Sequence, residues 1–227
     1  MLVEASELDR PGGPALDAGD VRHLGRVLRL RRGEPVTITD GLGRWRPCVW
    51  RDAETAPEPV GEVASEQRLT PKVTVGFAPV KGDRPEWVVQ KLTEVGVDRI
   101  VVLRTDRSVV KWNGLRADAA LARLRVVSRE ALMQSRQVFL PVVEGILRPA
   151  DVAGAALADF DGEALGLGRP TVLVGPEGGW SESEQQAMPA VRLGPDVLRA
   201  ETAALAAGVL LGALRANTVV CGDHGPW

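Results

Sequence analysis

Cysteine and histidine are scarce in this chain of 227 residues, which contains two of each. Cys48 and Cys221 lie far apart in the sequence, so a disulfide framework is not expected, and reduced thiols fit a cytoplasmic protein. Cys221 and His224 form only one potential pair of metal ligands and His23 is remote from both, so no metal site is expected. With two histidines and no Ser-His-Asp pattern, hydrolase chemistry also has little support.

Long apolar runs and common nucleotide motifs are absent as well. No run is long enough to cross a bilayer, and residues 1–4 lack the basic and apolar regions of a signal peptide, so we expect a soluble cytoplasmic protein with no membrane partner. The Gly-x4-Gly-Lys-Ser/Thr phosphate loop is missing, and Gly166-Leu-Gly168 precedes a strand-like run, which argues against a Rossmann-type site. The net charge of −2 argues against indiscriminate coating of nucleic acid, although the charge is uneven along the chain.

Two parts of the chain differ in pattern. Residues 35–39 and 44–50 alternate as strands do and are joined by Asp40-Gly-Leu-Gly43, a hairpin signal, and a further strand is expected at residues 59–64. We place a domain boundary near residues 67–71. Residues 1–69 are then expected to form a small β-barrel or sheet, and residues 70–227 a second domain.

The second part alternates strands with helices, which is typical of an α/β domain with a parallel sheet. Asp83 is expected to cap its first helix, and Ser181 with Glu184 to form a capping box. The last helix is apolar nearly all round, so the domain core or a second subunit must cover more than one side. The expected strands are residues 73–80, 100–103, 141–143, 155–157, 171–174 and 191–193, and the main helices are residues 85–95, 115–134 and 201–214.

Two glycine-proline turns follow neighbouring strand-like runs, at Gly175-Pro-Glu-Gly-Gly179 and at Gly194-Pro-Asp-Val-Leu-Arg199. Glycine lets the backbone approach a ligand closely, and proline stiffens a turn. One such turn by itself is better explained as a structural link between a strand and a helix. Two of them at the carboxyl edge of one sheet predict a ligand pocket lined by backbone groups.

Residues 21–32 hold five arginines and a histidine among apolar residues. One interpretation is a solvated helix face from which Leu24 and Leu28 pack inward. The other is a patch whose guanidinium groups bind an RNA backbone. A second basic group could extend that surface, and it consists of Arg116, Arg123, Arg125, Arg129 and Arg136.

Five motifs in register along almost the whole chain resemble the ribosomal RNA small subunit methyltransferase E family. They are His23-Leu-Gly-Arg-Val-Leu-Arg-Leu30 with the hairpin turn at residues 40–43, residues 81–99, Gln134-Ser-Arg136, and the two glycine-proline turns extended to Ala203. The resemblance implies an N-terminal PUA-like β-barrel and a C-terminal SPOUT-type α/β domain tied in a trefoil knot. It also implies a homodimer that uses S-adenosylmethionine to methylate N3 of one uridine in 16S rRNA, near the decoding centre of the small ribosomal subunit.

The resemblance also implies roles for individual residues. The cofactor-binding candidates are Leu157, Asp159, Val174, Gly175, Pro176, Glu177, Gly178, Gly179, Leu193, Gly194, Val197, Leu198, Thr202 and Ala203. The RNA-binding candidates are Arg22, Arg26, Arg29, Arg31, Arg32, Lys81, Arg84 and Arg136.

Methylation at N3 requires loss of the imide proton, and a nearby arginine would stabilise the anion that forms. Arg199 is the first candidate for this catalytic role and Arg136 the second, while Glu201 is a candidate proton acceptor or pocket organiser. The alternative for Arg199 and Glu201 is an ion pair that fixes the last helix.

Two alternatives to this function stay open. The cofactor loops do not specify the acceptor, so a SPOUT methyltransferase that acts on another RNA, such as transfer RNA, is one of them. The other is a non-catalytic PUA-like RNA-binding assembly factor, because Gln137 and Asp196 depart from the family pattern. The intact cofactor loops count against this second alternative.

Overall fold

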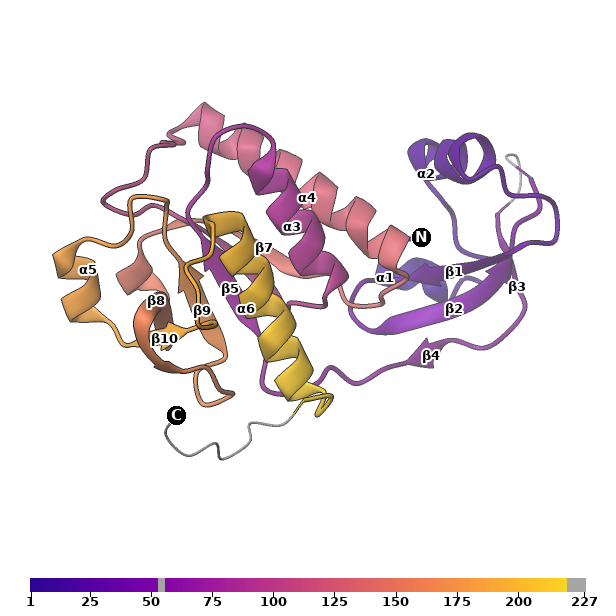
Figure 1. Ribbon diagram of the computed structural model, residues 1–227. Helices are drawn as coiled ribbons and strands as arrows, with labels where there is room; N and C mark the ends of the chain where they lie inside the picture. The colour runs from indigo at the N-terminus through magenta and orange to yellow at the C-terminus, as the bar shows by residue number, and fades with distance from the viewer. Residues whose placement is uncertain (53–55, 220–227) are drawn as a thin grey trace. The chain divides into compact units, whose positions relative to one another are not determined.

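The computed structural model describes residues 1–52 and 56–219, which form two compact units (Figure 1). One unit contains residues 1–68 and 132–140, and the other contains residues 69–131 and the chain from residue 141 on. The elements are α1 (Ala5–Leu8), α2 (Ala18–Arg22), a π-helical turn (His23–Val27), β1 (Pro35–Thr39), β2 (Arg44–Val49), β3 (Glu58–Pro59), β4 (Ala64–Ser65), β5 (Thr74–Phe77), α3 (Arg84–Glu94), β6 (Arg99–Leu103), α4 (Leu115–Ser135), β7 (Val142–Leu147), a 3-10 turn (Pro149–Asp151), β8 (Ala155–Ala164), β9 (Thr171–Val174), α5 (Glu182–Ala187), β10 (Ala190–Arg192) and α6 (Ala200–Arg215).

An antiparallel sheet forms the basis of the first unit. β1 pairs with β2 along its whole length, and β2 also pairs with β3 and β4. The Asp40 carboxylate accepts hydrogen bonds from the backbone N–H groups of Leu42 (2.7 Å) and Arg44 (3.1 Å), which confirms the expected hairpin turn. The continuous strand expected at residues 59–64 is wrong, because only the two-residue strands β3 and β4 pair there. Pro59 pairs with Cys48 and the N–H of Val60 still donates to the carbonyl of Pro47 (3.0 Å), but the described pairing stops there until Ala64.

A segment from much later in the chain completes the first unit. The backbone N–H of Gly43 donates to the carbonyl of Val138 (2.9 Å), and that of Leu140 donates to the carbonyl of Gly41 (2.8 Å). Met133 packs against the buried cluster of this unit, which includes Leu8, Leu24 and Ile38. The expected first domain, residues 1–69, does not include this segment. Pairing between residues that are far apart in the chain produces no local sequence signal.

A six-stranded parallel sheet with the order β10-β8-β9-β5-β6-β7 lies at the centre of the second unit. The expected α/β class is confirmed. All four residues of β5 are buried, which is typical of a parallel strand covered on both faces. In β6, Ile100 and Val102 belong to one buried cluster, whereas Val101 and Leu103 belong to another, because successive side chains point to opposite faces.

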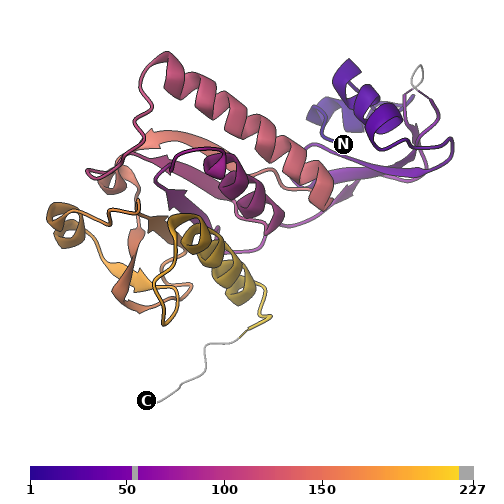
Figure 2. The ribbon, with the colours of Figure 1, turned by 45° about the horizontal axis from the view of Figure 1, so that its top comes forward.

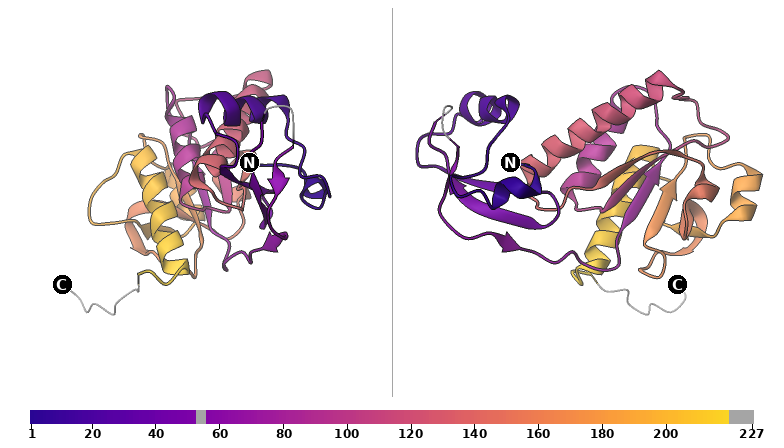
Figure 3. Two further views of the ribbon diagram at one scale, coloured as in Figure 1. Left: turned by 90° about the vertical axis from the view of Figure 1, so that its right-hand side faces the viewer. Right: turned by 180° about the vertical axis from the view of Figure 1, so that it is seen from behind.

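Helices α3, α4 and α6 cover one face of this sheet (Figures 1 and 3), and α3 lies between the other two (Figure 2). The Thr93 and Ser128 hydroxyls lie 3.1 Å apart and join α3 to α4. A Cβ at Gly208 of α6 would come within 2.8 Å of the Leu92 side chain, so glycine permits the close approach of α6 to α3. Within the described residues, no helix is both long and apolar enough to cross a membrane.

The expected capping of α3 by Asp83 is wrong. Asp83 precedes the helix, but its side chain makes no capping hydrogen bond, and its ψ of 6° lies outside the extended region that a side-chain cap adopts. Pro85 in the first turn has no backbone N–H. The first turn of α3 therefore has one free donor fewer for a capping side chain to satisfy.

A buried ion pair fastens the end of α6 to the sheet. The Arg215 guanidinium pairs with the Asp98 carboxylate, and their side chains are 8% and 4% exposed. Arg215 also donates to the carbonyl of Gly96 (2.9 Å), and Asp98 accepts from the backbone N–H of Val73 (2.7 Å). The chain before β5, the turn before β6 and the end of α6 therefore meet at these two side chains.

We expect Arg215→Ala to lower the free energy of unfolding by about 3–5 kcal/mol, because it leaves the Asp98 carboxylate buried without its counter-charge. Urea unfolding followed by circular dichroism measures this loss. Lys91→Ala is the control, since the Lys91 and Glu94 side chains are 31% and 30% exposed and water screens their pairing. Equal losses for the two variants would show that the Arg215 ion pair does not fasten α6.

Candidate functional site

The loops that follow β9 and β10 enclose a cavity of about 710 Å³ in the second unit. Parallel strands end at the same edge of a sheet, so residues 175–180 after β9 and residues 193–199 after β10 reach the same place. The third wall comes from β8, whose register against β10 shifts between Leu157 and Glu163. Ala158, Asp159 and Phe160 fall in this irregular stretch and line the cavity.

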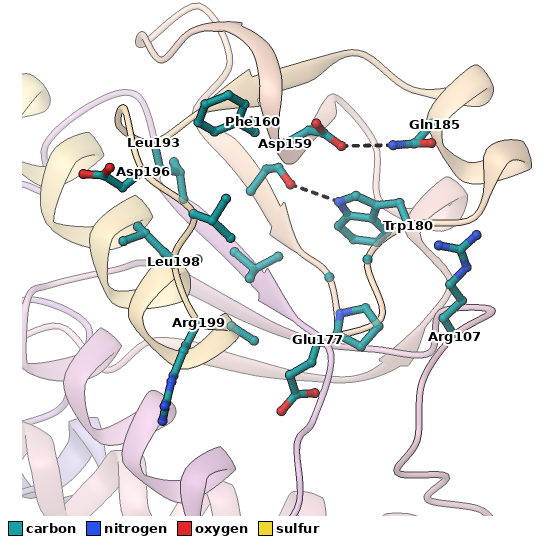
Figure 4. Close-up of a pocket in the computed structure, with 18 of the residues that line it drawn as sticks. Arg107, Asp159, Phe160, Glu177, Trp180, Gln185, Leu193, Asp196, Leu198 and Arg199 are labelled. Atoms are coloured by element: carbon teal, nitrogen blue, oxygen red, sulfur yellow. Dashed lines mark hydrogen bonds between the residues drawn. The ribbon is translucent and has the colours of Figure 1, made fainter.

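Trp180 holds the loop after β9 in place. Its indole is 5% exposed, and its Nε1–H donates to the carbonyl of Ala158 (3.0 Å), which ties the loop to the irregular stretch of β8. Beside it, the Gln185 amide of α5 donates to the Asp159 carboxylate (3.1 Å), as Figure 4 shows. These two contacts fix one wall of the cavity.

The loop after β6 braces the same wall from the other side. The Arg107 guanidinium donates to the carbonyl of Gly178 (3.0 Å), and the Ser181 hydroxyl donates to the Asp106 carboxylate (2.6 Å). Ser181 and Glu184 form the expected capping box at the start of α5. The short helix is therefore held at its first turn by residues of two loops.

Most residues expected at the cofactor site line this cavity, and these are Asp159, Val174, Gly175, Pro176, Glu177, Gly179, Leu193, Gly194, Val197, Leu198 and Ala203. Three expected residues do not line it. Leu157 is buried in the cluster on the other face of the sheet, Gly178 lies against Arg107, and Thr202 is exposed on α6. Arg107, Phe160 and Gln185 line the cavity without having been predicted, because tertiary pairing brings their elements to the site. Trp180 was identifiable only by its place at the end of a glycine-rich turn.

Arg199 lines the cavity, and its guanidinium is directed away from Trp180 (Figure 4). Glu201 does not line it, and Arg199 and Glu201 form no ion pair in the described structure. Instead, Nη1 of Arg84 lies 3.8 Å from Oε1 of Glu201 and 3.6 Å from Oε1 of Glu177. The suggested Arg199–Glu201 pair is therefore wrong, because Arg199 has an extended backbone just before α6 whereas Glu201 lies within its first turn. Arg84 joins the loop after β9 to the first turn of α6.

The RNA-binding candidates of the first unit are exposed, and these are Arg22, Arg26, Arg29, Arg31 and Arg32. In the same segment Leu24 packs inward as expected, but Leu28 is 46% exposed. Arg136 is exposed in residues 132–140 of the first unit and is not among the residues that line the cavity. Lys81 and Arg84 are exposed in the second unit.

Residues 1–52 and 56–219 contain no group of three or more His, Cys, Asp or Glu side chains that could hold a metal ion. Cys221 and His224 lie outside the described residues. Cys48 is a buried free cysteine, and burial raises the pKa of its thiol. A thiol kept protonated in this way is a poor metal ligand.

Known proteins resemble this chain over most of its length. The family model described as an RNA methyltransferase domain matches residues 67–212, and the one described as an RNA methyltransferase PUA domain matches residues 16–49, in agreement with the expected fold class. Ribosomal RNA small subunit methyltransferase E of Mycobacterium bovis is 35% identical, over 94% of this chain and 90% of that protein. The Bacillus subtilis protein of that name is 29% identical, over 82% and 84%.

A solved structure agrees with these sequence matches. The Neisseria gonorrhoeae ribosomal RNA small subunit methyltransferase E, bound to S-adenosyl methionine, has a TM-score of 0.74 and 31% identity to this chain. The match covers 88% of this chain and 90% of the Neisseria gonorrhoeae chain.

We expect Gly175→Ala to weaken binding of S-adenosylmethionine about tenfold, which corresponds to about 1.4 kcal/mol. The added Cβ would come within 3.0 Å of the Trp180 indole, so the cavity wall must shift. Isothermal titration calorimetry measures the affinity. Gly168→Ala is the matched control, because a Cβ there meets nothing within 4 Å. Identical affinities for both variants would mean that the ligand does not depend on the loop after β9.

Proposed function

The chain belongs to the ribosomal RNA small subunit methyltransferase E family, and we propose that it methylates N3 of a uridine in 16S rRNA of the small ribosomal subunit. S-adenosylmethionine is its cofactor. The observation that carries the proposal is the cavity between the loops after β9 and β10, where the residues carried over from the family gather. Its proposed substrate assigns the enzyme to the cytoplasm.

The lining of the cavity fits this cofactor in size and chemistry. Its volume of about 710 Å³ lies within the range of small-molecule sites. Val174, Leu193 and Leu198 offer apolar surface for an adenine ring, and the turn at residues 175–179 offers backbone groups for its polar edge. Glu177 lines the wall, and Oε1 of its carboxylate lies 3.6 Å from Nη1 of Arg84, so that guanidinium offsets its negative charge. When bound, the cofactor supplies an electrophilic methyl group.

Two residues of this chain receive roles in the reaction. The N3 proton of uridine passes to solvent water before the nitrogen accepts a methyl group, and negative charge then spreads to the two ring oxygens. The Arg199 guanidinium stabilises that charge, because its exposed side chain is free to rotate toward the cavity. Glu201 positions Arg84 and the start of α6, since its carboxylate lies outside the cavity lining.

We expect Arg199→Ala to lower the methylation rate about 100-fold or more, the cost of removing a charge-stabilising hydrogen-bond donor, with little change in cofactor affinity. Cells lacking the gene would be complemented with each variant, and N3-methyluridine in 16S rRNA would be mapped. Wild-type protein restores the modification and Arg199→Ala does not.

Arg192→Ala is the matched control, because Arg192 is exposed on β10 and does not line the cavity. It should restore methylation fully. If Arg199→Ala loses cofactor affinity while its turnover per bound complex survives, the catalytic role is wrong. If deleting the gene leaves N3-methyluridine in 16S rRNA unchanged, the proposed substrate is wrong.

We further propose that the enzyme is a homodimer that pairs through α6. One face of α6 packs in the core through Ala203, Ala204, Ala207 and Leu211. The opposite face still carries apolar side chains, and Val209 is 45% exposed. A second copy would remove this surface from water, which explains why the helix is apolar nearly all round.

We expect Val209→Arg to convert the dimer to a monomer, because it places a charge in the apolar contact. Sedimentation velocity measures the change. Val126→Arg on α4 is the matched control, since Val126 is also 45% exposed on a helix. A wild-type protein that sediments as a monomer, or a Val209→Arg variant that stays dimeric, would contradict this arrangement.

A further inference from the structure

A second cavity, of about 620 Å³, lies close to the cofactor site in the second unit. The loop after β6 contributes to both, because Arg107 lines the cofactor cavity whereas Thr105 and Ser108 line the second. Helix α5 is shared in the same way, with Gln185 on the first cavity and Ser183 on the second. One loop and one short helix therefore separate the two cavities.

Basic side chains dominate the field of this second cavity. Arg104, Lys111 and Arg148 line it, are exposed, and have no side-chain ion pair or hydrogen bond in the described part of the chain. Two acids also line it, but both are engaged in hydrogen bonds. The Asp106 carboxylate accepts from the hydroxyls of Ser181 (2.6 Å) and Ser183 (3.3 Å).

The second of these acids, Glu184, accepts from the backbone N–H groups of Ser181 (2.9 Å) and Asp106 (3.1 Å). Both carboxylates are thus committed to holding α5, while the three cations keep all their donors available. A ligand in this cavity meets a net positive charge, because three cations face two carboxylates.

The remaining lining groups favour phosphate over a base. The Thr105 and Ser108 hydroxyls lie 2.8 Å apart and bond to each other, and each residue is 6% exposed, whereas Asn113 adds an exposed amide. Guanidinium, ammonium and hydroxyl groups are the donors that bind phosphate oxygens in nucleic-acid complexes. Among the described residues no aromatic side chain lines the cavity, so they offer no surface on which a base could stack.

We propose that this cavity binds a backbone phosphate of the RNA substrate, beside the nucleotide that enters the cofactor cavity. Recognition of RNA in particular rests on the proposed function. A strand that places one base in the cofactor cavity has its neighbouring phosphates within reach of the next cavity, because only the loop after β6 and α5 intervene. Phosphate contacts fix the position of a nucleic acid without reading its sequence.

Fluorescence anisotropy with a short labelled single-stranded RNA, repeated at several salt concentrations, tests this inference. We expect Arg104→Ala and Arg148→Ala each to weaken RNA binding about tenfold. Each should also reduce the slope of log affinity against log salt by about 0.7, because one phosphate contact is lost. Arg104→Lys keeps the charge and should keep most of the slope. Cofactor affinity should be the same in all variants.

Arg169→Ala is the control, since Arg169 precedes β9 and thus lies at the opposite end of this strand from the ligand loops. It should leave RNA binding unchanged. If Arg104→Ala and Arg148→Ala bind RNA with the same affinity and salt slope as Arg169→Ala, the inference is overturned.

Inorganic phosphate distinguishes a small ligand from RNA. Phosphate that stabilises the wild-type protein against heat but not Arg104→Ala, with equal RNA affinities for both proteins, would assign the cavity to a free phosphate compound and overturn the RNA inference. A wild-type protein that fails to methylate small ribosomal subunits, while these variants still lose RNA affinity, would overturn the proposed function and support the phosphate site.

Discussion

The parallel pairing of β9 with β5 on one side and β8 on the other decides where the ligand loops of the second unit lie. All six strands of this sheet run in the same direction, so the chain leaves β9 and β10 at one edge and leaves β6 at that edge as well. Each exit loop is then held by a specific contact. Trp180 binds the carbonyl of Ala158, Arg107 binds that of Gly178, and Arg84 lies between the carboxylates of Glu177 in the loop after β9 and Glu201 in the first turn of α6.

The charges around this edge follow a consistent arrangement. Carboxylates near the loops are mostly engaged in holding structure: Asp106 and Glu184 fix α5, and Glu201 faces Arg84. Exposed arginines also line the cavities, Arg199 the cofactor cavity and Arg104 the second one. Neither forms an ion pair within the described residues. An enzyme that brings a cationic cofactor and an anionic RNA together needs both kinds of surface within a short distance. The loop after β6 provides that proximity.

Local sequence signals predicted several features correctly because each depends on residues close together in the chain. The capping box of Ser181 and Glu184, the hairpin turn at Asp40 and the parallel α/β pattern belong to this group. The prediction that Asp83 caps α3 was wrong for a reason that is also local. The backbone at Asp83 does not adopt the extended conformation that capping requires. At residues 59–64, the structure has two separate two-residue strands, β3 and β4, in place of the one strand that the pattern indicated.

The sequence by itself determined the family, the fold class and the glycine-proline loops that carry most of the cavity lining. Backbone conformation and the ends of strands depend on residues that are neighbours in the chain. Tertiary structure alone decided which side chains meet across those loops. It paired Glu201 with Arg84 and left Arg199 at the rim of the cavity, and it returned residues 132–140 to the first unit. It also placed Arg104 and Arg148 around a second cavity. Contacts of this kind join residues tens of positions apart, and their energies depend on distances that no local pattern encodes.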